Sequence, residues 1–145
     1  MLFRSLAVGD GDGDVISGAA VMPDITQDGQ FVVFASDQDL VESTSVRQVY
    51  VHDRDTGDVV VASVDDAGDL GNAGSALVHA PSISDDGLRV AFESDASNLV
   101  SFDSNGRTDA FVRYLDTEET RRVSEEAAVE EFGRASCRER VYACV

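Results

Sequence analysis

The 145-residue chain contains no lysine and no tryptophan, and the shortage of basic side chains excludes one class of function. All eleven basic residues are arginine, against 28 acidic residues, and the formal net charge is −17 at pH 7. Because no basic stripe is available to bind phosphates, we do not expect nucleic acid as a partner. The acids are spread over every loop, which favours a halophilic protein whose self-repulsion is screened by concentrated salt. An acidic face for a basic partner is the alternative.

Long apolar runs and catalytic motifs are also missing. No stretch approaches the roughly 20 apolar residues that span a bilayer, and residues 1–8 lack the apolar core of a signal peptide. There is no Gly-x-Ser-x-Gly elbow, no His-Glu-x-x-His and no phosphate-binding glycine loop. We therefore expect no membrane-spanning segment and no enzymatic activity.

Cysteine occurs only at Cys137 and Cys144, in a terminal stretch whose composition turns basic. Residues 133–145 closely resemble the translation of a common sequencing adaptor. We expect this tail to be non-native and to pack on nothing, so its cysteines carry no information about the redox compartment.

What the chain does contain is one pattern present twice. Residues 23–37 and 81–95 align without a gap at an offset of 58, each with an Asp-Gly pair between two apolar stretches. Asp-Gly favours a two-residue hairpin in which both turn residues take a positive φ. Each copy therefore predicts a β-hairpin, with Phe31, Val33 and Phe34, or Val90 and Phe92, as core candidates.

The match continues downstream at an offset of 61, because the second copy carries three extra residues in the preceding loop. The pattern predicts four short strands in each unit, at Val21–Thr26, Phe31–Ser36, Val49–Asp53 and Val59–Ser63, then at His79–Ser84, Arg89–Ser94, Ala110–Tyr114 and Thr120–Ser124. A period of this length indicates stacked repeats, since one unit alone cannot bury both faces of its sheet.

The ordered motifs of the repeat resemble those of TolB-like, WD-repeat-like β-propellers. The shared pattern is Pro-x-hydrophobic-Ser-x-Asp-Gly, a strand ending in Phe-x-Ser, an Asp-hydrophobic-aromatic-Val strand and an Asp-x-x-Thr-Gly turn. The last two are matched by Gln48–Val51 with Asp53–Gly57, and by Asp109–Val112 with Asp116–Glu118. The sequence departs from the pattern at Gln48, where Asp is expected, and at Glu118, where Gly is expected.

The resemblance implies an all-β chain with two consecutive four-stranded antiparallel blades of a β-propeller, truncated at both ends. The expected divisions are the end of one blade at 1–4, blades at 5–62 and 63–123, and the start of another at 124–132. The whole of 1–132 is then a partial propeller, to be completed by the remaining blades of the parent protein.

By analogy with this family, we expect a non-catalytic scaffold that binds a protein or peptide. One alternative is an accessory propeller of a larger enzyme, such as an α/β-hydrolase peptidase. Another is a calcium-stabilised extracellular repeat. The resemblance suggests a periplasmic, cell-surface or extracellular location.

Acidic loops make calcium the one candidate cofactor. In the second unit, Asp103, Asn105 and Asp109 offer side-chain oxygens around the turn at Gly106. The alternating aspartates of 10–14 and the related stretch 65–69 also offer carboxylates, although solvated loops explain them equally. His52 and His79 are isolated from other metal ligands; we expect His52, whose counterpart is Arg113, to be exposed, and His79 to lie at the entry to the innermost strand.

Overall fold

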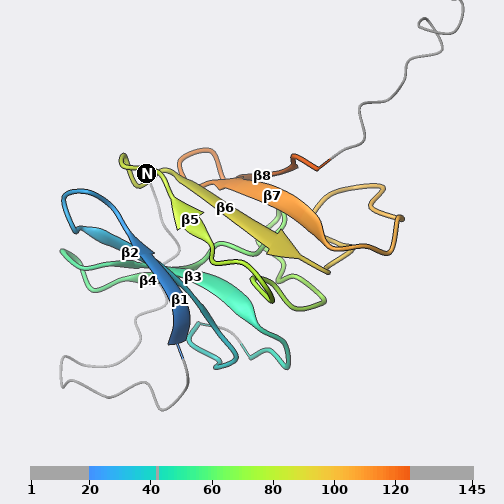
Figure 1. The fold of residues 1–145 in the computed structure, drawn as a ribbon, viewed down its shortest axis with the longest axis horizontal. Helices are drawn as coiled ribbons and strands as arrows, with labels where there is room; N and C mark the ends of the chain where they lie inside the picture. Colours follow the sequence, from blue (N-terminus) through green and yellow to red (C-terminus); the bar gives the residue numbers. More distant parts are fainter. Residues whose placement is uncertain (1–19, 42, 125–145) are drawn as a thin grey trace, which may run out of the picture.

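The computed structural model describes residues 20–41 and 43–124, and this part of the chain is all-β, with no helix. The first sheet comprises β1 (Ala20–Ile25), β2 (Phe31–Ser36), β3 (Gln48–Asp53) and β4 (Val59–Val61) (Figure 1). The second comprises β5 (Ser82–Ile83), β6 (Arg89–Ser94), β7 (Asp109–Tyr114) and β8 (Glu119–Arg122). Within the described ranges no helix is long and apolar enough to span a membrane.

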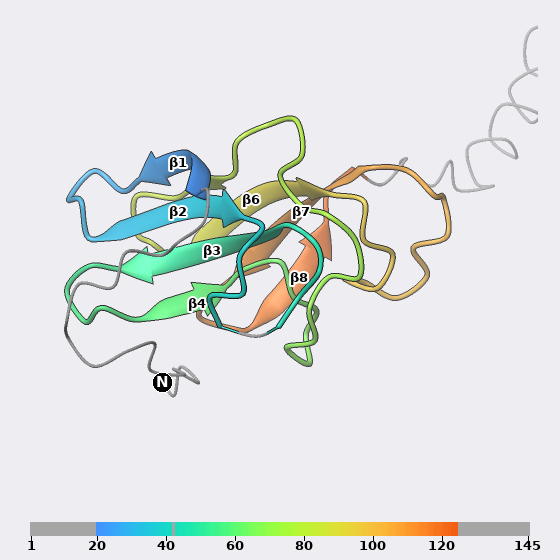
Figure 2. The same cartoon turned by 90° about the horizontal axis from the view of Figure 1, so that it is seen from below.

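Each sheet is an open antiparallel meander in which neighbours in sequence are neighbours in space. The two sheets lie next to each other with their strands inclined, as Figures 1 and 2 show. This confirms the prediction of two four-stranded antiparallel sheets and the place of all eight strands, most to within two residues.

The first strand of the second sheet is the main departure, because β5 holds two residues where six are predicted. Glu93 projects from β6 and accepts hydrogen bonds from the backbone N–H groups of Val78 and His79, at 2.5 and 2.9 Å. In the first sheet Ala35 occupies the matching position and pairs with Val21. At Val78 and His79 the Glu93 side chain therefore accepts the backbone hydrogen bonds, and regular strand pairing begins only at Ser82.

The Asp-Gly turns also differ from the predicted two-residue hairpin. The amide of Gly29 bonds to the carbonyl of Thr26, and that of Gly87 bonds to Ser84, so each turn spans four residues. Only the glycines have a positive φ, 75° and 69°. Asp28 and Asp86 instead accept hydrogen bonds from the hydroxyls of Thr26 and Ser84 and from the amides two residues ahead, an arrangement that stabilises a wider turn.

The main core contains residues of both sheets, which contribute faces that are not equivalent. The first sheet contributes Val33, Ala35, Val49 and Val51, here called its back face. The second sheet contributes Val90, Phe92 and Phe111. At the repeat offset these correspond to Val32, Phe34 and Tyr50, which lie on the opposite, front face of the first sheet and pack in a smaller cluster. The front face of one unit therefore packs on the back face of the unit before it.

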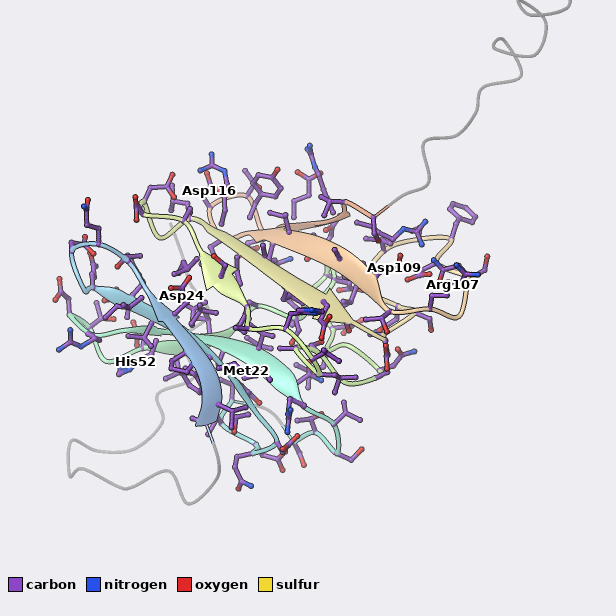
Figure 3. All side chains as sticks on the ribbon, in the orientation of Figure 1. Met22, Asp24, His52, Arg107, Asp109 and Asp116 are labelled. Carbon is purple, nitrogen blue, oxygen red and sulfur yellow. The ribbon has the colours of Figure 1, made fainter. Side chains whose placement is uncertain are left out.

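Asp24 makes a polar link between the first strands of the two sheets. Its carboxylate accepts hydrogen bonds from the amides of Ile83, at 3.1 Å, and Ile25, at 2.9 Å. The bond from Ile83 is the main reason why the pKa of Asp24 lies below its usual value, against the opposing effect of burial. Figure 3 shows Asp24 on β1, on the side of the first sheet that meets β5.

Candidate functional site: the long-loop end

Long loops gather at one end of the two sheets because every even-numbered strand of a meander leaves its sheet there. Segments 37–47, 71–81 and 95–108 lie at this end, and the tight turns lie at the other (Figure 2). Asn72 fastens two of these segments together: it accepts from the amide of Ser97, and its own amide donates to Asn98, both at 2.9 Å. The long-loop end is therefore cross-linked by side chains.

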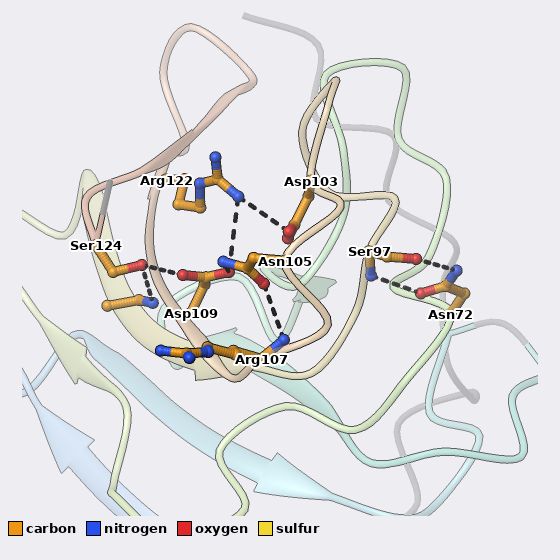
Figure 4. Close-up of polar contacts among 9 residues, drawn as sticks. Asn72, Ser97, Asp103, Asn105, Arg107, Asp109, Arg122 and Ser124 are labelled. Atoms are coloured by element: carbon orange, nitrogen blue, oxygen red, sulfur yellow. Dashed lines mark hydrogen bonds and ion pairs between the residues drawn. The ribbon is translucent and has the colours of Figure 1, made fainter. Parts of the chain in front are cut away.

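The three predicted calcium ligands come together at this end, around an arginine (Figure 4). The Arg122 guanidinium lies 2.9 Å from Asp103 and 3.7 Å from Asp109. Asn105 donates to Asp109 at 2.7 Å, and Ser124 donates to its other oxygen at 2.5 Å. Burial raises the pKa of Asp109, but the hydrogen bonds from Ser124 and Asn105, with the charge of Arg122, hold it below its usual value.

Arg122 gives these carboxylates the partner that a calcium ion would provide. The side chains of Asp103 and Asp109 are only 3% and 5% exposed, so both depend on a nearby cation. Among the described residues no group of three His, Cys, Asp or Glu side chains has the arrangement of a metal site. The calcium site at Asp103, Asn105 and Asp109 stays a prediction, and a calcium ion would have to compete with the guanidinium.

The first repeat has a neutral version of the same contact. Gln48, the counterpart of Asp109, accepts from the Ser63 hydroxyl at 2.5 Å and donates to the Gly71 carbonyl at 2.9 Å. In each repeat the serine hydroxyl also accepts the amide that follows the Gln or Asp. The two units thus share a strand-linking contact, and only the second one is charged.

The other acidic candidates do not form a cluster. Asp65 accepts from the amides of Ala67 and Asp69, both at 2.9 Å, so this carboxylate closes its own turn. Residues 10–14, the expected blade segments before 20 and after 124, and the tail 133–145 with both cysteines lie outside the described residues.

The two histidines lie apart from each other in different surroundings. His79 is largely exposed and its Nδ1 lies 2.8 Å from Glu93. Burial raises the pKa of Glu93, but the hydrogen bonds from the ring and amide of His79 and from Val78 outweigh it and lower the pKa. The prediction of an exposed His52 is wrong, since His52 is half-buried and its counterpart Arg113 is buried. His52 and Arg113 lie on the front faces of their sheets, and the alignment of the repeats does not show that these faces are covered.

Two further residues stand out that the sequence analysis did not select. Phe102 is 96% exposed on the β6–β7 loop and has a positive φ of 66°. Arg113 is 6% exposed between the sheets. A signal for Phe102 is present in the sequence, because it lies in the loop that carries the three extra residues. No family model matches the chain, and the search of curated proteins gave no match.

Proposed function

We propose that the two sheets are consecutive blades of a TolB-like β-propeller that acts as a non-catalytic scaffold for a protein or peptide. The observation that carries this proposal is the packing of one unit's front face on the previous unit's back face. Such a contact is heterologous: it leaves one front face and one back face for further units, here the remaining blades of the parent protein. A ring of such units has a loop-bearing end suited to binding.

Phe102 is the best candidate anchor for the partner. The backbone on both sides of it is anchored, because Leu99 is 1% exposed in the core and the Asp103 carboxylate is turned inward to Arg122. Large aromatic side chains are typical of residues that dominate binding energy, and an anchored backbone lowers the entropic cost of binding. Its left-handed backbone conformation costs about 1 kcal/mol, which the surrounding contacts must offset.

The partner's docking surface should be basic around a pocket for the phenyl ring. The formal net charge of the chain is −17, so charge complementarity favours a positively charged rim on the partner and fast association at low salt. We also propose that the acidic surface suits concentrated salt: the free energy of unfolding should increase between about 0.1 and 1 M KCl as the Debye length falls from about 10 to 3 Å. A flat or falling urea midpoint over that range would contradict this second point.

Cross-linking from two ends of the molecule tests the scaffold function. Phe102 is replaced by the photo-cross-linking residue p-benzoylphenylalanine in the full chain, which is irradiated in an extract of its own cells. Asp116, exposed on a tight turn at the other end (Figure 3), serves as the matched control. We expect the chain that carries the cross-linker at position 102 to form an adduct with one protein, and the chain that carries it at position 116 not to form that adduct. Phe102→Ala should weaken binding of that protein by about 2 kcal/mol, roughly thirtyfold; an equal adduct from both positions would contradict the proposal.

A further inference from the structure

A cavity of about 220 Å³ lies where the outer strands of the two sheets meet, away from Phe102 and the Arg122 cluster. Its aliphatic lining comes from the β2–β3 loop, from β4, from the segment after β4 and from the β7–β8 turn: Val41, Val60, Val61, Val64, Leu70 and Leu115. Val64 and Leu115 are buried, whereas the rim residues Asp66, Ala67 and Glu118 are exposed. The cavity therefore combines aliphatic side chains with exposed, charged residues at an open rim.

Arg113 supplies the one positive charge in this lining. Its Nη1 donates to the carbonyls of Asp65 and Glu118, at 3.0 and 2.8 Å, and to the Thr120 hydroxyl at 3.2 Å. These acceptors are neutral, and no described carboxylate forms a salt bridge with the guanidinium. Its Nε is buried and has no hydrogen-bond partner in the described structure. A buried cation with only neutral contacts favours an anion.

Two carboxylates at the rim, those of Asp66 and Glu118, favour a positively charged group instead. Asp66 accepts from the amide of Thr120 at 2.7 Å through Oδ1, and Glu118 lines the cavity from the β7–β8 turn. Asp66 and Glu118 line the same cavity as Arg113. Burial lowers the pKa of Arg113, while the charges of Glu118, Asp66 and Asp65 raise it. A simple anion would meet their repulsion, and a simple cation would meet that of Arg113.

We propose that this cavity binds a free α-amino acid with a branched aliphatic side chain. A zwitterion satisfies both charges at once: its carboxylate faces Arg113 and its ammonium group faces Asp66 and Glu118. The aliphatic side chain then lies against the valine and leucine walls, which remove it from water. This site is separate from the proposed protein-binding residues, since it uses neither Phe102 nor the Arg122 cluster, and Val41 is its one lining residue from the long-loop end.

Calorimetry on the full chain with three matched probes tests the charge pattern. L-Leucine carries both charges, 4-methylpentanoate only the carboxylate, and 3-methylbutylamine only the ammonium group. We expect leucine to bind with a Kd on the order of 1 mM or tighter and each analogue to bind at least about tenfold more weakly. Absence of saturable leucine binding, or equal binding of either analogue, would overturn the proposal.

Variants at the rim locate the site without disturbing the core. Ala67→Phe should fill the cavity mouth and abolish leucine binding, whereas Ala110→Phe, on the exposed back face of the second sheet, should not change it. Asp66→Asn keeps an acceptor for the Thr120 amide but loses the charge, so leucine should bind about tenfold more weakly. Asp69→Asn, in the same turn but outside the cavity, is its control. Unchanged binding by Ala67→Phe would place leucine elsewhere.

Discussion

The back faces of the two sheets have nearly the same backbone and different surroundings. In the first sheet this face carries Val33, Ala35, Val49, Val51 and, on β4, Val60, all packed in or against the main core. At the same positions the second sheet has Ala91, Glu93, Ala110, Val112 and Arg121, none of them buried. The comparison shows that the repeat determines where strands form, while the side chains differ between the face that packs on the other described sheet and the face that does not.

On the front faces, by contrast, the aromatic side chains of the two sheets have the same geometry, and only the cluster in which they pack differs. Phe34 and Tyr50 stack with ring centroids 5.8 Å apart at 24°, and Phe92 and Phe111 stack at the same distance and angle. The first pair lies in the smaller cluster, and the second lies in the main core between the sheets. Equivalent aromatic pairs thus offer a direct measure of what stacking of the units contributes.

Truncating one aromatic ring in each pair should have the largest effect. Phe92→Ala removes a side chain that is 5% exposed in the main core and is the counterpart of Phe34, and we expect a loss of about 3–5 kcal/mol in the free energy of unfolding. Phe34→Ala, at 8% exposure in the smaller cluster, should cost less. Urea unfolding of both variants measures the difference. Equal losses would mean that stacking of the sheets adds little.

The charged contact of the second repeat should come next in size. Arg122→Val, which introduces the residue found at Val61 in the first repeat, leaves Asp103 and Asp109 buried without a cation and should cost about 3 kcal/mol. Adding Asp109→Gln reproduces the neutral contact of the first repeat and should recover part of that loss. A double variant no more stable than Arg122→Val would show that the two contacts are not interchangeable.

A smaller effect is expected at the turn before the last strand of each sheet. Gly57 has φ 82°, and its counterpart Glu118 has φ 57°, which a side chain makes unfavourable. Glu118→Gly should stabilise the protein by about 0.5–1 kcal/mol and Gly57→Ala should destabilise it by a similar amount. Thermal unfolding without added ligand compares them; destabilisation by Glu118→Gly would mean that its carboxylate near Arg113 outweighs the backbone strain.

Calcium should give the smallest effect, and only in the second repeat. Because Arg122 already neutralises Asp103 and Asp109, wild-type affinity should be no tighter than about 10⁻⁴–10⁻³ M, and Arg122→Val should bind calcium more tightly. Calorimetry with Asp103→Ala as the control measures both. Equal heats from wild type and Asp103→Ala would leave this loop as a turn.

The sequence was sufficient to predict the strands, because alternation and turn residues act locally and the repeat doubles each signal. It also placed Asp103, Asn105 and Asp109 in one loop, where the structure joins them around Arg122, although their role as calcium ligands stays a prediction. It did not identify Arg122 as their partner, because that contact joins positions 13 to 19 residues apart across a loop and a strand. The burial of Arg113 was missed for a related reason. Whether a front face is covered depends on the neighbouring sheet, and the alternation of residues within one strand carries no information about that sheet.

The one-directional packing of the sheets has a consequence for how such a chain can change over generations. Because each unit presents the same pair of unlike faces, an in-frame duplication of one whole unit supplies its own matching surface on both sides. A point mutation is less freely accepted, since a change on a front face must suit the back face encoded about 60 residues earlier. A substitution in one repeat thus constrains its neighbour, and a unit that follows the second sheet would have to accommodate Glu93 and Arg121 on that sheet's back face.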